Sequence, residues 1–110
     1  MQVIIDHQGL HVRLTDERLA HILDHPEMAG LEEKISETLA HPVLVIKSIS
    51  DGAARLYYRY YSGTRLGDKF VCVVVKVTES DAFVLTAYLT DKPKKGAVCG
   101  TQAYKGLVRR

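Results

Sequence analysis

The stretch FVCVVVKVT, residues 70–78, is the valine-rich segment from which the fold is predicted. β-branched residues dominate it, and such side chains suit the pleated, half-buried surface of a sheet. Its apolar run, Val71–Val75, has the length of a strand and is far too short to cross a membrane. We therefore expect a buried strand here and no transmembrane segment.

Three neighbouring segments complete a sheet around this strand. Residues 43–49 and 55–61 flank Asp51-Gly52, a dipeptide typical of hairpin turns. Residues 79–81 turn the chain into a last strand over residues 83–89. Consecutive strands joined by short turns form an antiparallel meander, so we predict a four-stranded antiparallel β-sheet.

Two short helices are predicted before the sheet. Thr15 is a good N-cap for the first helix, and Pro26 ends that helix at or before His25. Apolar residues at spacings of three and four predict the second helix, which His41-Pro42 stops: Met28, Leu31, Ile35 and Leu39. The expected fold class is α+β, with an N-terminal helical hairpin packed on the four-stranded sheet. Residues 1–13 predict only a short strand or an extended arm.

Length and composition describe one globular domain spanning residues 1–110. Apolar residues make up 46% of the chain and charged residues 25%, as in ordinary soluble proteins. The N-terminus lacks the basic and apolar regions of a signal peptide. Only two cysteines are present, Cys72 and Cys99, which is too few for a disulfide framework. We therefore expect a reduced, cytoplasmic protein.

Charge is divided unevenly along the chain. Residues 1–40 carry a net charge of −5, and residues 41–110 carry +7. A polyanion would be drawn to the second part. Acidic helices beside a basic sheet, with no ligand at all, explain the same division equally well.

Alternation along the strands assigns side chains to two sheet faces. The face expected to receive the helices carries Leu56, Tyr58, Tyr60, Val71, Val73, Val75, Val77, Phe83, Leu85, Ala87 and Leu89. The opposite face mixes cations, hydroxyls and aromatic rings: Arg55, Tyr57, Arg59, Tyr61, Phe70, Cys72, Val74, Lys76, Val84, Thr86 and Tyr88.

The mixed face suits RNA, since cations neutralise phosphate and aromatic rings stack on bases. The residues expected to bind nucleic acid come from this face and from the basic turn at residues 91–96: Arg55, Tyr57, Tyr61, Lys92, Lys94 and Lys95. A solvated face on which tyrosines fill area explains the pattern without a ligand. Pattern alone slightly favours the solvated face.

Histidines form the only compact cluster of titratable residue types. Two pairs have the i, i+4 spacing that can hold a metal on a helix: His7 with His11 and His21 with His25. Cys72 or His41 could complete such a site, but no Cys-x2-Cys pair exists and the first pair is not expected to be helical. We therefore predict no metal and no cofactor. His21 and His25 suit proton transfer and ordinary surface contacts about equally.

A series of short motifs resembles one known family. The motifs are Leu14-Thr15, His21-Ile22, His25-Pro26-Glu27, Pro42, Tyr57-Tyr58-Arg59, the valine-rich strand ending in Lys76, and Leu85-Thr86-Ala87-Tyr88. Their order resembles the phage-associated barnase-EndoU-colicin-RelE type nuclease domains over about residues 12–96. The resemblance implies a small α+β domain with toxin-like, metal-independent ribonuclease activity. Its implied catalytic residues are His21, His25, Arg59, Lys76, Thr86 and Tyr88.

Such an enzyme would cleave RNA by attack of a 2′-hydroxyl on the adjacent phosphorus. His21 would serve as general acid or base, and Lys76 and Arg59 would stabilise the developing charge. Thr86 and Tyr88 would orient phosphate oxygens. The expected partners are RNA and, as a further candidate, an inhibitor or antitoxin protein. The alternative function is a non-catalytic, phage-derived module that binds RNA or a protein.

Overall fold

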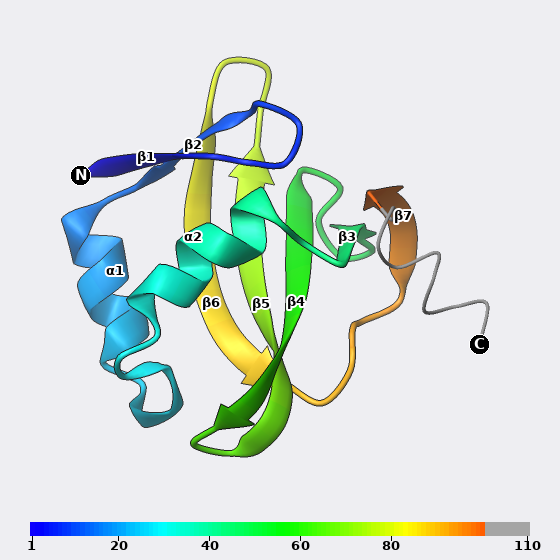
Figure 1. The fold of residues 1–110 in the computed structure, drawn as a ribbon. Coiled ribbons are helices and arrows are strands. Elements are labelled where there is room, and N and C mark those ends of the chain that lie inside the picture. The colour runs from blue at the N-terminus through cyan, green and yellow to red at the C-terminus, as the bar shows by residue number, and fades with distance from the viewer. Residues whose placement is uncertain (101–110) are drawn as a thin grey trace.

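One mixed sheet runs through the computed structural model of the protein, which describes residues 1–100 (Figure 1). In this range it has seven strands in the order β1-β2-β6-β5-β4-β3-β7. The strands are β1 (Gln2–Ile5), β2 (His11–Leu14), β3 (Leu44–Ser48), β4 (Ala54–Thr64), β5 (Gly67–Val77), β6 (Ala82–Thr90) and β7 (Gly96–Gly100). The helical elements are α1 (Asp16–Leu23), the 3-10 turn η1 (Pro26–Met28) and α2 (Glu32–Ala40).

The predicted four-stranded antiparallel meander is wrong, because three more strands extend the sheet. The four expected strands lie within β3 to β6, but β1 and β2 form a hairpin at one edge and β7 pairs with β3 at the other. β2 lies parallel to β6, which makes the sheet mixed. These added strands are four or five residues long; β1 pairs locally with β2, whereas β2 and β7 join the sheet by pairing with the distant strands β6 and β3. Local periodicity does not show such pairing.

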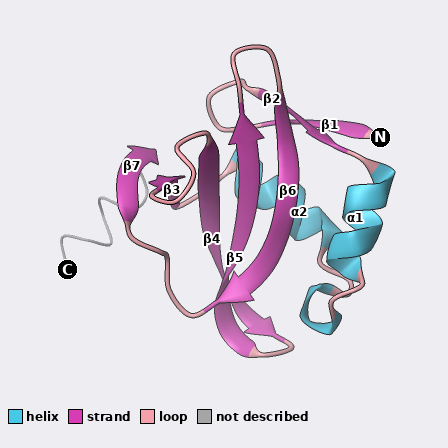
Figure 2. Cartoon of the chain, turned by 180° about the vertical axis from the view of Figure 1, so that it is seen from behind, coloured by secondary structure: helices cyan, strands magenta, loops and turns pink. Residues whose placement is uncertain are grey.

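The predicted helical hairpin is also wrong. α1 packs on β6, whereas α2 packs on β5, β4 and β1. The 3-10 turn and Gly30, which has a positive φ of 78°, separate the two helices. Both helices lie on the same face of the sheet but over different strands, and the opposite face carries no helix from residues 1–100 (Figure 2).

A large core fills the space between the helices and the sheet. Its centre consists of side chains that are completely buried: Val12, Ile22, Ile35, Leu39, Val71, Val73 and Val75. Val71, Val73 and Val75 of β5 face the helices, as their alternation predicts. A second, smaller cluster lies on the opposite face and contains Leu44, Ile46, Leu56, Tyr58 and Cys72.

The expected faces of β4 are reversed. Tyr57 pairs with Val73 across the strands and therefore lies in the helix-side core, while Leu56 pairs with Val74 on the other face. Tyr61 and Arg59 follow Tyr57 in alternation and lie beneath α2. Both faces of β4 carry large side chains, so alternation defines two sides without saying which side the helices cover.

A β-bulge in β6 changes a second set of faces. Val74 pairs with Thr86 but Val75 pairs with Val84, which leaves Leu85 as an extra residue. Because of this shift, Val84 enters the helix-side core and Leu85 joins Thr86 on the other face. The sequence analysis assigned Phe83 and Leu85 to the helix-covered face and Val84 to the other face. This assignment is the reverse of the structure, because it assumed an unbroken period of two.

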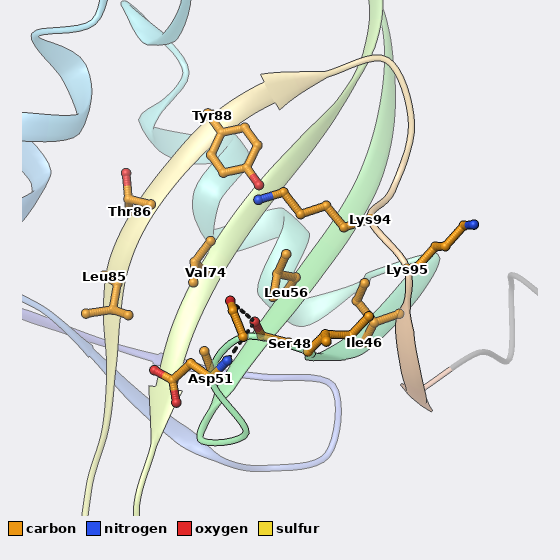
Figure 3. A pocket seen from close by; sticks show the side chains of 13 residues that line it. Ile46, Ser48, Asp51, Leu56, Val74, Leu85, Thr86, Tyr88, Lys94 and Lys95 are labelled. Atoms are coloured by element: carbon orange, nitrogen blue, oxygen red, sulfur yellow. Dashed lines mark hydrogen bonds between the residues drawn. The ribbon is translucent and has the colours of Figure 1, made fainter.

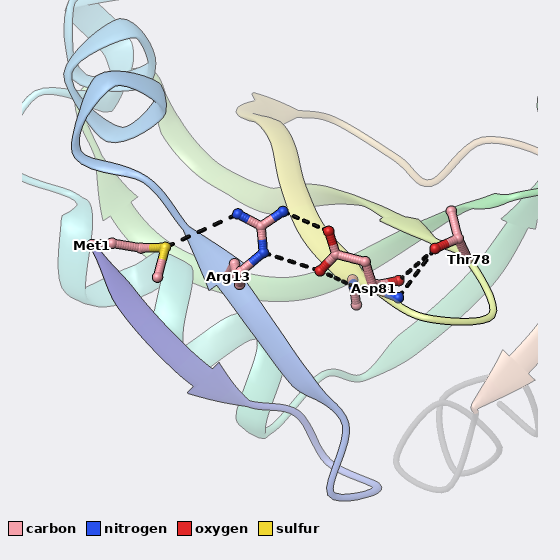
Figure 4. A network of polar contacts seen from close by, with 5 residues as sticks. Met1, Arg13, Thr78 and Asp81 are labelled. Carbon is pink, nitrogen blue, oxygen red and sulfur yellow. Dashed lines mark hydrogen bonds and ion pairs between the residues drawn. The ribbon is translucent and has the colours of Figure 1, made fainter.

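A bidentate ion pair joins β2 to the start of β6 (Figure 4). Arg13 Nε and Nη2 donate to the two carboxylate oxygens of Asp81 at 3.0 and 2.5 Å. The Arg13 guanidinium also lies 5.6 Å from the centre of the Phe83 ring. The guanidinium holds the pKa of the Asp81 carboxyl below its usual range. This pair supports a parallel contact that has only one registered residue pair, Arg13 with Phe83.

A buried carboxylate ties the β1-β2 hairpin to β4. Asp6 is 5% exposed, and the hydroxyl of Tyr57 donates to its Oδ2 at 2.6 Å. The backbone amides of Gln8 and Leu10 donate to its Oδ1, each at 2.9 Å. Every oxygen of the carboxylate thus has a donor, as a buried charge requires.

We expect Tyr57→Phe to lower the free energy of unfolding by about 1–3 kcal/mol, because it leaves a buried carboxylate oxygen without its donor. Urea denaturation followed by circular dichroism measures this loss. Tyr60→Phe is the matched control, since Tyr60 is 49% exposed and should tolerate the change. Equal stability of the two variants would contradict a stabilising role for the Tyr57–Asp6 bond.

Candidate nucleic-acid interface

A groove of about 530 Å³ opens on the sheet face that carries no helix (Figure 3). Its floor is apolar and consists of Ile46, Ala54, Leu56, Val74 and Leu85. Its walls are polar and consist of Ser48, Ser50, Asp51, Thr86, Tyr88, Lys94 and Lys95, with Ile49 at the rim. We call this site the open-face groove. Its volume lies within the range of about 300–1,000 Å³ that is usual for ligand sites.

Cross-strand pairing across the centre of the sheet builds the groove. One row of paired residues is Leu56, Val74 and Thr86, and the next row is Tyr58, Cys72 and Tyr88. Residues paired in this way lie side by side on one face. The apolar members therefore form the floor, and Thr86 and Tyr88 line the wall on β6.

The segment after β6 brings lysines to the mouth of the groove. The backbone amide of Lys94 donates to the Tyr58 hydroxyl at 3.0 Å, which fixes this segment against the sheet. The Lys94 ammonium lies 6.0 Å from the centre of the Tyr88 ring, at the limit of a cation–π contact. Lys94 and Lys95 are both exposed; the Lys94 side chain extends over the groove toward Tyr88, whereas the Lys95 side chain points away from it (Figure 3).

The ionisable groups at the two ends of the groove differ: tyrosine hydroxyls lie at one end, and the Asp51 carboxylate lies at the other. Burial, followed by the nearby Cys72 sulfur, raises the pKa of the Tyr88 and Tyr58 hydroxyls. Both phenols stay protonated at neutral pH and can donate hydrogen bonds. At the other end, the Lys76 ammonium donates to Asp51 Oδ2 at 2.5 Å and, with the Ala53 amide, lowers the pKa of that carboxyl.

Five of the residues predicted from sequence gather here. Thr86, Tyr88, Lys94 and Lys95 line the groove, and Lys76 reaches it through its ion pair with Asp51. Three of these five belong to the predicted catalytic set, and two to the predicted nucleic-acid-binding set. The groove is therefore the place where both sets meet.

The other predicted residues lie elsewhere. His21 is exposed on α1 and His25 is exposed just after it, at the start of η1; their rings lie 5.8 Å apart on the helix-covered side of the sheet. Arg59 donates to the His41 carbonyl at 2.7 Å, and the Tyr61 hydroxyl donates to Glu37 at 2.7 Å. Tyr57 is buried on the same side, and Arg55 shares its face. Lys92 is exposed and borders a second hollow beside β3 and β7.

Nine lining residues were not in the predicted site: Ile46, Ser48, Ile49, Ser50, Asp51, Ala54, Leu56, Val74 and Leu85. Asp51 was interpreted only as part of a turn, and the position of Leu85 depends on the bulge. Ser48 carried a usable signal, because it follows Ile46 by two residues on the same strand and must share its face. Ser48, at the end of the groove that carries the Asp51 carboxylate and the serine hydroxyls, could thus have been predicted from the sequence.

The described residues contain neither a cluster of metal ligands nor a membrane-spanning helix. Among residues 1–100, no three His, Cys, Asp or Glu side chains are grouped so that they could hold a metal ion. Neither α1 nor α2 nor any other helix in that range combines the length and the apolar character needed to span a membrane.

Comparison with protein-family models, with curated proteins and with solved structures finds no match.

We expect the two cysteines to differ sharply in reactivity. Burial raises the pKa of the Cys72 thiol to about 11, whereas Cys99 is exposed on β7. Titration of the folded protein with Ellman's reagent at pH 8 should modify one thiol, and titration after unfolding should modify two. Cys99→Ser should abolish the native reaction. Rapid native modification of that variant would contradict the burial of Cys72.

Proposed function

We propose that the protein binds RNA through the open-face groove. The observation that carries this proposal is the combination of an apolar floor, a wall with Thr86 and Tyr88, and a cationic mouth at Lys94 and Lys95. Bases need apolar and aromatic surface, whereas phosphates need cations. A groove with an apolar floor for the base and lysines at its mouth for the phosphate fits one nucleotide.

The two lysines at the mouth are available for phosphate. Lys34, Lys69 and Lys76 each pair with a carboxylate. Within residues 1–100, neither Lys94 nor Lys95 forms an ion pair. An ammonium group without a carboxylate partner gains most from a phosphate, because no existing pair has to be broken.

The hydroxyl groups favour RNA over DNA. Ser48, Ser50 and Thr86 present hydroxyls along the walls, and each can donate to or accept from a ribose 2′-hydroxyl. The floor residues Leu56 and Val74 and the ring of Tyr88 provide the surface on which a base can rest. Free bases are available only in unpaired strands, so single-stranded RNA is the proposed ligand.

The proposal also includes a location. RNA is found in the cytoplasm, and Cys72 and Cys99 are both free thiols, which a reducing compartment maintains. The resemblance to phage-associated nuclease domains supports the same location.

We expect Lys94→Ala/Lys95→Ala to weaken binding of a fluorescent single-stranded RNA by about 10- to 30-fold, since each lost charge contact contributes about 1 kcal/mol. Fluorescence anisotropy over a salt series should also show a shallower salt dependence, by about 1.4 in the log–log slope. Arg18→Ala/Arg65→Ala removes the same charge from exposed positions away from the groove and is the control. Equal affinities of both double variants would contradict the proposed site.

Cleavage of the bound RNA is a second candidate function. It is favoured by one observation: Lys76, Thr86 and Tyr88 of the predicted catalytic set lie at the same groove as Lys94 and Lys95. A 2′-hydroxyl would attack phosphorus and give up its proton to solvent water, lysine ammonium groups would neutralise the phosphorane, and the Tyr88 hydroxyl would transfer its proton to the leaving 5′-oxygen. An inhibitor protein would then be a natural partner.

If cleavage occurs, Lys76→Ala and Tyr88→Phe should each lower its rate by about 100-fold or more, which is the usual contribution of a charge stabiliser or a general acid. His21→Ala should leave the rate unchanged, because His21 lies on the helix-covered side. Gel analysis of a labelled single-stranded RNA measures all three rates. A large loss in His21→Ala with full activity in Tyr88→Phe would place the chemistry outside the groove.

A further inference from the structure

A second hollow lies directly beside the open-face groove. It has a volume of about 430 Å³ and is lined by Leu44, Pro93 and Val98, together with three residues that also line the groove, Ile46, Lys94 and Lys95. Lys92 and Gly96 complete its border. The segment from Pro93 to Gly96 therefore forms a ridge with a hollow on each side and lysines at its centre.

The ridge is held in place at both ends. The Lys94 amide donates to the Tyr58 hydroxyl at 3.0 Å, and β7 then pairs with β3 from Gly96 onward. Only glycine fits at that position, because a Cβ on Gly96 would lie 2.3 Å from the Lys47 carbonyl oxygen. The two hollows consequently keep a constant spacing, as a binding surface with two seats requires.

The two hollows differ in chemistry. The groove has Asp51 and several hydroxyls, which can contact the edge of a base. No carboxylate lines the second hollow within the described residues; its polar side chains are lysines, and of its apolar ones Leu44 and Ile46 are buried, whereas Val98 is 55% exposed. Such a surface suits stacking and phosphate contact without reading a base edge.

We propose that the second hollow is a second nucleotide seat, so that the ligand is single-stranded RNA of at least two nucleotides with a phosphate held at Lys94 and Lys95. This inference rests on the proposed RNA binding and specifies its substrate class. The shared lysines carry the argument: one anionic link between two planar units matches one cationic ridge between two hollows. A mononucleotide would fill only one of them.

The test compares uridine 5′-monophosphate with the dinucleotide pUpU, by isothermal titration calorimetry on the full chain. The second seat predicts at least about ten-fold tighter binding of the dinucleotide, which is typical of one added stacked base with its phosphate. Val98→Glu places a negative charge in the second hollow. It should reduce the dinucleotide advantage to within about two-fold, and it should weaken the monophosphate less than the dinucleotide, because only the nearby charge of Lys94 and Lys95 is affected in that case.

Two matched variants complete the test. Ile49→Glu adds the same charge at the rim of the groove, at a side chain that is 78% exposed, and should weaken both ligands. Val3→Glu adds it at an exposed position on β1 and should weaken neither. Thermal melting confirms that each variant is folded.

The outcomes separate this inference from the proposed function. Binding of both ligands with no dinucleotide advantage, or an advantage that Val98→Glu leaves intact, would overturn the second seat and leave RNA binding in place. No binding of monophosphate, dinucleotide or longer RNA by the folded protein would overturn both.

Discussion

The pairing register of β5 with its two neighbours is the constraint on which the rest of the structure depends. Val73 pairs with Tyr57 on β4 and with Ala87 on β6, so one row of side chains faces the helices. The next row, which includes Cys72, must then face the other side. A shift of one residue would exchange the core and the groove completely. The bulge at Leu85 shifts the register for the three pairs that follow it, from Val75–Val84 to Val77–Ala82.

The sheet divides the polar chemistry of the chain between its two faces. On the helix side, polar side chains bind one another or the backbone, as Tyr57 does with Asp6 and Tyr61 with Glu37. On the open face, Lys94 and Lys95 have no such partners among the described residues and stand beside a hollow. Satisfied groups stabilise a fold, whereas unpaired charges at a concave surface favour a ligand. This contrast is the reason for proposing the open face as the binding surface.

Much of the local structure could be predicted. Capping by Thr15, termination by Pro26 and the valine alternation of β5 depend on neighbouring residues, and each acts as expected. Lys76, Thr86 and Tyr88 were likewise placed on a common face, because β5 alternates without interruption and Thr86 and Tyr88 lie on the same side of the bulge. The errors concern β4, whose two faces are similarly large and aromatic, residues 83–85 at the bulge, and the strands β2 and β7, whose partners in the main sheet are remote in sequence.

The sequence by itself determined the strand periods of β3 to β6, the helix limits near Pro26 and the excess of positive charge after residue 40, because these depend on residue type and short-range spacing. Only the tertiary structure decided which face the helices cover, that His21 and Lys76 lie on opposite sides, and that residues 93–96 form a ridge between two hollows. Those features depend on contacts between segments far apart in the chain. Burial and long-range register select among them, and neither is encoded in any single stretch.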